Sequence, residues 1–204
     1  MAQITAPDGR ALFGTGQKWI EKGDRIVLLG SNGAGKTQMI HAVLASITAP
    51  EATPFIKAVP TLVLGYSDQH LGQLPTAATP FALVSKWTEA DSTARNLMAN
   101  AGIRADWQGR AILALSGGQK ARLAMLLLRL AHPNFFILEE PTNHLDIEGQ
   151  EALQNELCAV SATCLVVSHD RHFIRSVGTR FWQISGKALT EVDNPERFFA
   201  TQLG

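Results

Sequence analysis

Short apolar runs alternate with longer amphipathic segments along most of the chain. Five of the apolar runs have the length and residue types of buried strands: Arg25–Leu29, Leu62–Tyr66, Phe135–Leu138, Cys164–Ser168 and Arg180–Ile184. Helical spacing of apolar residues is found between them, at Thr37–Ser46, Gly117–Ala131, Ile147–Cys158 and His172–Val177. Apolar strands that alternate with helices are typical of sheets covered on both faces. The pattern therefore predicts an α/β fold with a mainly parallel sheet flanked by helices.

The middle of the chain has a different pattern. From about residue 71 to residue 131, strand signals are scarce and helical spacing dominates, as in Ser92–Ala101 and Ala121–Leu130. We therefore expect one domain, residues 1–204, in which a helical subdomain at about 71–131 is inserted into a core made by about 1–70 and 132–204. Its two tryptophans, Trp87 and Trp107, are expected to be buried core residues.

Composition narrows the classes of protein to consider. The chain has 204 residues, 46% of them hydrophobic, and its 18 basic and 18 acidic residues give a formal net charge of zero. The charge therefore supplies no direct evidence for nucleic-acid binding. We see no transmembrane segment and no secretory signal, and we expect a cytoplasmic protein. Cys158 and Cys164 form no metal-binding spacing and are expected to be reduced thiols.

The segment Gly30–Thr37 fits the pattern G-x-x-x-x-G-K-[ST] and lies between an expected strand and an expected helix. Its glycines let backbone N–H groups approach phosphate oxygens, and the helix N-terminus adds further donors. Lys36 supplies a cation for the β- and γ-phosphates, and Thr37 supplies a hydroxyl for Mg²⁺. The predicted phosphate site consists of Gly30, Ser31, Asn32, Gly33, Ala34, Gly35, Lys36 and Thr37. A glycine-rich turn that binds nothing is the alternative, which the strand-loop-helix context disfavours.

Two carboxylates follow the apolar run at residues 135–138. Glu139 and Glu140 end an expected parallel strand, where ligands bind in open α/β sheets. One carboxylate can hold Mg²⁺ and the other can orient and deprotonate water. A pair of solvated carboxylates at a turn is the alternative interpretation.

Two further segments carry candidate chemistry. In Leu115-Ser116-Gly117-Gly118-Gln119, Ser116 is a good N-cap, and the glycines leave N–H groups open to an anion. By composition alone, a plain capped helix is the better interpretation of this segment. His169 follows the strand-like run at 164–168 and so falls at the edge where ligands bind, which favours a functional role over a structural one.

In this order, the segments resemble the ATPase domain of the ATP-binding cassette (ABC) proteins. The matching motifs are Walker A at Gly30–Thr37, Gln69 in Tyr66-Ser67-Asp68-Gln69, the signature at Leu115–Gln119, Walker B at Phe135–Glu140, and His169. The run Glu140-Pro141-Thr142-Asn143-His144-Leu145-Asp146 resembles the F subfamily, ABC-F. The segments at 64–70 and 167–173 are also similar to ABC-F, and to its second cassette most.

The resemblance implies an Mg²⁺-dependent ATPase and a role for each matching position. Glu140 would be the general base, and His169 would contact the γ-phosphate and position the attacking water. Gln69 would sense the γ-phosphate and, with Thr37, bind Mg²⁺, and Glu139 stands where the family usually has an aspartate. The signature residues Ser116, Gly117, Gly118 and Gln119 would complete an ATP site on an opposing cassette, and Asp146 would lie at the interface. The implied partners are a second cassette, identical or different, and the ribosome, on which many ABC-F proteins act.

This sequence departs from the family pattern in three respects. Glu139 reaches about 1.5 Å further than an aspartate would. The segment Ile4–Arg10 has no aromatic residue to stack on adenine, and we expect Phe13 to belong to a strand or the core, so GTP stays open as a substrate. The chain holds one cassette and no long basic linker of the kind typical of ABC-F.

Two alternatives of a different class stay open. One is an ATPase subunit of an ABC transporter, which would need a groove for a permease helix within residues 71–107. The other is a catalytically weak module that binds nucleotide and changes shape.

Overall fold

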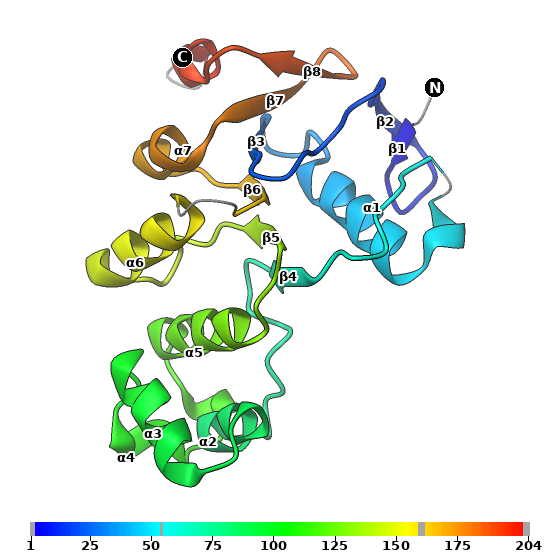
Figure 1. The fold of residues 1–204 in the computed structure, drawn as a ribbon. Helices are drawn as coiled ribbons and strands as arrows, with labels where there is room; N and C mark the ends of the chain where they lie inside the picture. The colour runs from blue at the N-terminus through cyan, green and yellow to red at the C-terminus, as the bar shows by residue number, and fades with distance from the viewer. Residues whose placement is uncertain (1–2, 54, 159–161, 202–204) are drawn as a thin grey trace.

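The computed structural model of the chain describes residues 3–53, 55–158 and 162–201 (Figure 1). The strands of this part form one eight-stranded sheet in the order β1-β2-β8-β7-β3-β6-β5-β4. They are β1 (Gln3–Thr5), β2 (Ala11–Gly14), β3 (Arg25–Leu29), β4 (Leu64–Ser67), β5 (Phe135–Glu139), β6 (Cys164–Val167), β7 (Arg180–Ser185) and β8 (Ala188–Val192). Only the pairs β1–β2 and β7–β8 are antiparallel among the strand pairs of the described residues. The predicted α/β fold with a mainly parallel sheet is confirmed.

Helices connect strands β3 to β7 along the chain, and one more helix follows the last strand. They are α1 (Lys36–Thr48), α2 (Pro80–Val84), α3 (Asp91–Asn100), α4 (Ala105–Gln108), α5 (Gly117–Leu130), α6 (Ile147–Cys158), α7 (Arg171–Val177) and α8 (Glu196–Thr201). Short 3₁₀ turns occur at Pro50–Ala52, Ser85–Trp87 and Ile112–Ala114. None of the described helices has the length and apolar content needed to cross a membrane.

Strand β5 is buried along its whole length, and its side chains pack alternately into two different core clusters. Phe135 and Ile137 pack in a cluster that includes Ile40 of α1. Phe136 and Leu138 pack instead in a cluster that includes Met125 of α5. Successive side chains of a strand point to opposite faces, so α1 and α5 cover opposite faces of the sheet.

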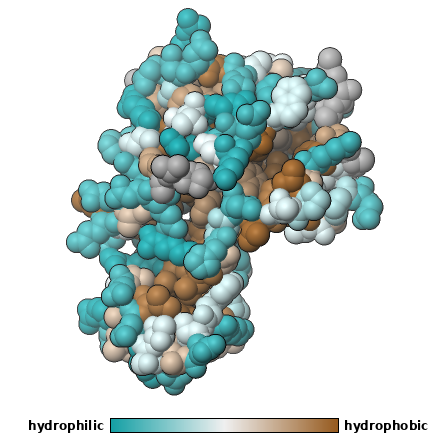
Figure 2. Space-filling view, viewed as in Figure 1, coloured by the Kyte–Doolittle hydropathy of each residue, from teal (hydrophilic) through white to brown (hydrophobic). Residues whose placement is uncertain are grey.

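Helices α2 to α5 form a lobe beside the sheet, and the edge strand β4 is the strand nearest to them (Figure 1). The lobe has a core of its own, in which Met98, Trp107 and Leu123 are almost fully buried. On the side that faces the rest of the molecule, the lobe exposes apolar surface (Figure 2). The burial of Trp107 confirms the prediction for this residue, but Trp87 is 51% exposed, so the prediction was wrong there. The subdomain limits at 71 and 131 stay a prediction.

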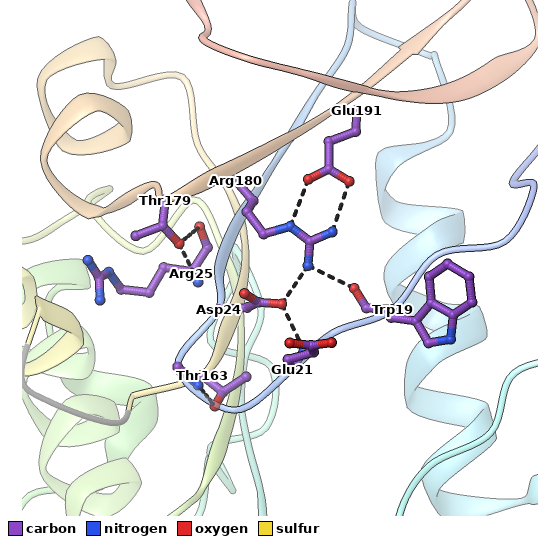
Figure 3. A network of polar contacts seen from close by, with 9 residues as sticks. Trp19, Glu21, Asp24, Arg25, Thr163, Thr179, Arg180 and Glu191 are labelled. Atoms are coloured by element: carbon purple, nitrogen blue, oxygen red, sulfur yellow. Dashed lines mark hydrogen bonds and ion pairs between the residues drawn. The ribbon is translucent and has the colours of Figure 1, made fainter.

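A polar network holds the strands together at the end of the sheet where β3 begins (Figure 3). The guanidinium of Arg180 donates two hydrogen bonds to Glu191, at 2.7 and 2.8 Å, and one to Asp24, at 2.5 Å. It also donates to the carbonyl of Trp19, at 3.0 Å. The network joins β7, β8 and the turn before β3. The candidate site lies at the other end of the parallel strands, where their carboxyl ends meet.

Candidate nucleotide site

The loop between β3 and α1 has the backbone that the glycine pattern predicts. Gly33 and Gly35 have φ angles of 77° and 102°, in the left-handed region that favours glycine. A Cβ atom on Gly35 would lie 2.9 Å from Leu12 Cδ1 and 3.0 Å from Phe13 Cε1, so β2 also requires a glycine there. Helix α1 begins at Lys36, and no side chain caps its first turn in this structure. The loop and helix thus present backbone N–H donors at one point, as phosphate sites do.

Lys36 folds back over this loop. Its Nζ donates to the carbonyls of Gly30, at 2.7 Å, and Ser31, at 3.2 Å. Burial lowers the pKa of Lys36, and the negative charge of Glu140 opposes that shift. The ammonium group is therefore held at the loop, where a phosphate can replace carbonyl oxygens as its partner.

Glu139 lies between α1 and β4. It continues the face of Phe135 and Ile137, which α1 covers, and its side chain is buried. Oε2 accepts a hydrogen bond from Thr37 Oγ1 at 3.0 Å, and Oε1 accepts one from the hydroxyl of Tyr66 at 3.3 Å. Burial, followed by the charges of Glu139 and Asp68, raises the pKa of Tyr66, so the hydroxyl stays protonated.

Glu140 is held by β6 instead. Its φ of 48° ends the regular alternation of β5, and its N–H donates to the carbonyl of Val167 at 2.8 Å. The carboxylate accepts a hydrogen bond from the N–H of His169 at 3.1 Å, and His169 Nε2 lies 3.4 Å from Oε1. Burial raises the pKa of Glu140, while His169 and Lys36 act in the opposite direction. A buried carboxylate of this kind is suited to accept a proton.

The residues near Thr37 fit a bound Mg²⁺ ion. Mg²⁺ takes oxygen ligands, is commonly held by one or two protein oxygens, and keeps waters and substrate phosphates as its other ligands. A hydroxyl and a carboxylate in direct contact, Thr37 and Glu139, supply that donor set. Within the described residues there is no group of three or more His, Cys, Asp and Glu side chains that could hold a metal on its own. The phosphates of a nucleotide would supply further oxygen ligands to a metal at this position.

The structure does not bring Gln69 into this group. Gln69 is exposed in the turn after β4, and within the described residues no hydrogen bond joins it to Thr37 or Glu139. Asp68 stabilises the turn by accepting hydrogen bonds from the N–H groups of His70 and Gly72, at 2.8 and 3.0 Å. The predicted role of Gln69 in binding Mg²⁺ and sensing the γ-phosphate stays a prediction.

The signature residues lie on the other side of the sheet from α1. Ser116 caps α5, and its hydroxyl and Gln119 form a reciprocal capping box, with distances of 3.3 and 2.9 Å. A Cβ atom on Gly117 would lie 3.0 Å from His144 Nδ1, and one on Gly118 would lie 3.0 Å from the carbonyl of His144. Within the described residues, no hydrogen bond joins residues 116–119 to residues 30–37. The signature is thus packed on the turn after Glu140, away from its own phosphate loop.

Sequence reasoning missed two features of this region. Tyr66 was part of a motif but had no assigned role, although parallel pairing with β5 puts it on the face of Glu139. Asp146 forms an ion pair with Arg122 of α5 and accepts a hydrogen bond from the N–H of Gly149 at 3.0 Å. The sequence does not predict the ion pair, because 24 residues separate Arg122 from Asp146. Phe13, by contrast, is buried in the core as expected.

Comparisons with known proteins show which family the chain resembles. A family model described as ABC transporter matches residues 18–143. Human ATP-binding cassette sub-family F member 3 is 35% identical over 83% of this chain and 24% of its own length. Ribosome protection protein VmlR of Bacillus subtilis is 34% identical over 88% of this chain and 32% of its own length. A dimeric ATP-binding cassette solved with ADP and phosphate has a TM-score of 0.68 over 90% of both chains, at 19% identity.

The chain spans about a quarter to a third of the length of the curated relatives that it matches. The match to the family model covers more than half of the chain. The resemblance to ABC-F proteins is confirmed by relatives that carry this subfamily name. The chain therefore belongs to the ABC transporter family, and its cassette is of the ABC-F kind.

Proposed function

We propose that this cassette binds ATP with Mg²⁺ and hydrolyses it to ADP and phosphate. The observation that carries the proposal is the separation of two adjacent carboxylates at the end of β5. Glu139 is joined to Thr37 of the phosphate loop, whereas Glu140 is joined to His169 after β6. One carboxylate suited to hold a metal ion and one suited to act as a base thus lie side by side on different supporting elements, which supports a role in hydrolysis of a phosphate anhydride.

Each residue has a distinct part in the proposed mechanism. Lys36 and the loop N–H groups bind the phosphates, and Thr37 with Glu139 would hold Mg²⁺. When bound, Mg²⁺ neutralises charge on the phosphates. The buried carboxylate of Glu140 accepts the proton of the attacking water, and its raised pKa makes it a stronger base. His169 holds that carboxylate through its main-chain N–H and its ring.

The site would be completed by a second cassette. Because residues 116–119 lie on the face of the sheet opposite to α1, they would serve an ATP molecule held by another cassette. The capped N-terminus of α5, with its two glycines, is a suitable surface for the γ-phosphate of that molecule. The fold of this chain also matches a cassette solved as a dimer.

The process that this ATPase drives is proposed to be related to translation. VmlR, one of the relatives, is named a ribosome protection protein, and several others carry the ABC-F name. Co-sedimentation of the Glu140→Gln variant with ribosomes in the presence of ATP would support this role. A chain that stays in the supernatant under these conditions contradicts it.

A transporter subunit is the second candidate, and a groove favours it. The groove has a volume of about 310 Å³ and lies between β4, α2 and α5. Among its lining residues are Gln73, Leu74, Pro75 and Leu83, from the segment where a permease helix would bind. Co-purification with a membrane protein, with no ribosome binding, would select this candidate.

ATP turnover by the purified chain tests the enzymatic proposal. Lys36→Ala is expected to abolish ATP binding, because the loop loses its cation. Glu140→Gln is expected to retain ATP but to slow turnover by roughly 10²- to 10⁴-fold, the usual contribution of a general base. Glu148→Gln, at an exposed glutamate in α6, is the matched control and should behave as wild type. Unchanged turnover in Glu140→Gln would remove Glu140 as the base, and ATP binding without turnover in the wild type would select the switch module.

A further inference from the structure

Sheet register places Tyr66 and Glu139 on the same face of the sheet. Strand β4 pairs with β5 in parallel, with Tyr66 opposite Ile137. Glu139 lies two residues after Ile137, and residues i and i+2 of a strand point to the same face. This is the face covered by α1, which carries Thr37.

The two oxygens of Glu139 are held by hydroxyl groups from two different elements. Thr37 of α1 donates to Oε2 at 3.0 Å, and Tyr66 of β4 donates to Oε1 at 3.3 Å. Glu139 is only 8% exposed, so water competes little for its carboxylate oxygens. The carboxylate therefore bridges α1 and the edge strand β4.

The length of the side chain at position 139 matters for this bridge. An aspartate is shorter by one methylene, about 1.5 Å. A carboxylate drawn back by that distance toward β5 could not keep both hydroxyl groups as partners at the observed positions. The contact with Tyr66 is already the longer of the two, so it is the one that an aspartate would lose.

The ring of Tyr66 is placed firmly enough to direct its hydroxyl. It is partly buried against the core cluster that contains Ile137 and Ile40. Its neighbour Ser67 points to the opposite face, where it accepts a hydrogen bond from Gln73 at 3.4 Å. The hydroxyl of Tyr66 is thus a donor on the face of β4 that α1 covers, whereas the hydroxyl of Ser67 lies on the opposite face.

We propose that Tyr66 is a positioning residue for the metal site: its hydroxyl orients the longer carboxylate of Glu139 so that the other oxygen stays directed at Thr37. The proposal rests on the proposed function, because it assumes that Glu139 and Thr37 hold Mg²⁺. It assigns a reason for a glutamate at this position, namely that Tyr66 and Glu139 act as a pair.

Mn²⁺ binding tests the pair without relying on turnover. Free Mn²⁺ is measured by electron paramagnetic resonance at saturating non-hydrolysable ATP analogue, for wild type, Tyr66→Phe, Glu139→Asp and the double variant. We expect Tyr66→Phe to weaken Mn²⁺ affinity by about tenfold, as loss of a partner that orients a metal ligand does. In the Glu139→Asp background the same change should have an effect of less than about twofold, since the contact is already lost.

Ser67→Ala is the matched control, because it removes the neighbouring hydroxyl on the opposite face. It should leave Mn²⁺ affinity as in wild type, and nucleotide affinity without metal should be the same in all variants. Thermal melts of each variant verify folding, and Glu139→Asp alone still tests the pair if Tyr66→Phe folds poorly, because it should weaken Mn²⁺ affinity by itself.

Two results would overturn the proposal while leaving the proposed function intact. One is wild-type Mn²⁺ affinity in Tyr66→Phe or in Glu139→Asp. The other is an equal loss of affinity on Tyr66→Phe in both backgrounds, which would show that Tyr66 acts independently of Glu139. A wild-type chain that binds no analogue would contradict the proposed function and this inference together.

Discussion

Glu140 combines a buried carboxylate with a left-handed backbone, a combination that costs free energy in the folded state. Its φ of 48° is unusual for a residue other than glycine, and such conformations are concentrated at functional sites. Its main-chain N–H is paired with Val167, and its carboxylate is paired with His169. The strand end is therefore held in a strained form by β6, and this directs the carboxylate away from Glu139.

Because burial raises the pKa of Glu140, we predict that the stability of the folded protein depends on pH through this residue. The folded state holds the proton more tightly than the unfolded state, so the contribution of this group is greatest below about pH 4.3 and is lost as pH rises through the folded pKa. Glu140→Gln removes the buried charge, so its Tm should exceed that of wild type at pH 7, and the difference should shrink toward pH 4. Each kcal/mol would appear as about 2–4 °C in Tm.

Asp146→Asn provides a control of opposite sign. The N–H of Gly149, and then the ion pair with Arg122, lower the pKa of Asp146. Its contribution is therefore present above about pH 4 and is lost as pH falls through the folded pKa. This variant should lower Tm at pH 7, with a loss that shrinks at acid pH. A Glu140→Gln variant that is less stable than wild type at pH 7 would contradict the burial argument.

At the scale of single residues, the sequence could predict the groups with a strict pattern. Gly33, Gly35, Lys36 and Thr37 occupy the predicted loop because their spacing is imposed by the backbone geometry that phosphates require. The contacts of Tyr66 and His144 depend on strand register and on a turn with φ of 69° at His144. No local pattern encodes these contacts, because both arise from pairing between segments far apart in the chain.

At the scale of elements, the packing of β4 against α5 joins the sheet to the helical lobe. Gly65 of β4 allows this close approach. A Cβ atom there would lie 2.7 Å from Leu128 Cδ1 and 2.8 Å from Pro133 Cγ, both packed side chains. The absence of a side chain at position 65 is thus a requirement of the interface.

Gly65→Ala is therefore expected to destabilise the protein by about 1–3 kcal/mol, the usual cost of overpacking a core. Gly109→Ala is the matched control, because a Cβ atom at Gly109 meets nothing within 4 Å and its φ of −95° suits alanine. We expect this control to stay within about 0.5 kcal/mol of wild type in urea unfolding. Equal stabilities for the two variants would contradict the close packing of β4 on α5.

The sequence predicted the strands that are buried on both faces, but it missed the strands at the β1 edge of the sheet. Strand β5 is apolar throughout because both of its faces are covered. Strands β1, β2 and β8 were not predicted, since each has a single buried residue and therefore no run of buried apolar positions. Strand β8 also depends on a two-residue turn, Gly186 and Lys187, with φ angles of 57° and 64°. A Gly-Lys pair is a weak signal for such a turn.

At the scale of the whole molecule, the two segments that we propose form an ATP site with a second cassette lie on opposite faces of one sheet. The phosphate loop opens α1, and the signature opens α5. Both roles are predicted from the order of motifs along the chain and stay predictions. Their separation in space is a property of the fold, because it depends on which helix covers which face of β5.

Mixing two inactive variants is the most direct test of the central claim, that the phosphate loop of one copy works with the signature of another. Lys36→Ala disables the loop, and Ser116→Glu places a negative charge where the opposing triphosphate would bind. In an equal mixture, half of the pairs would contain both variants, and each of these has one intact site. We predict ATPase activity of about a quarter of the wild-type level in the mixture, from statistical pairing of two copies. A mixture no more active than the two variants measured separately would contradict the account.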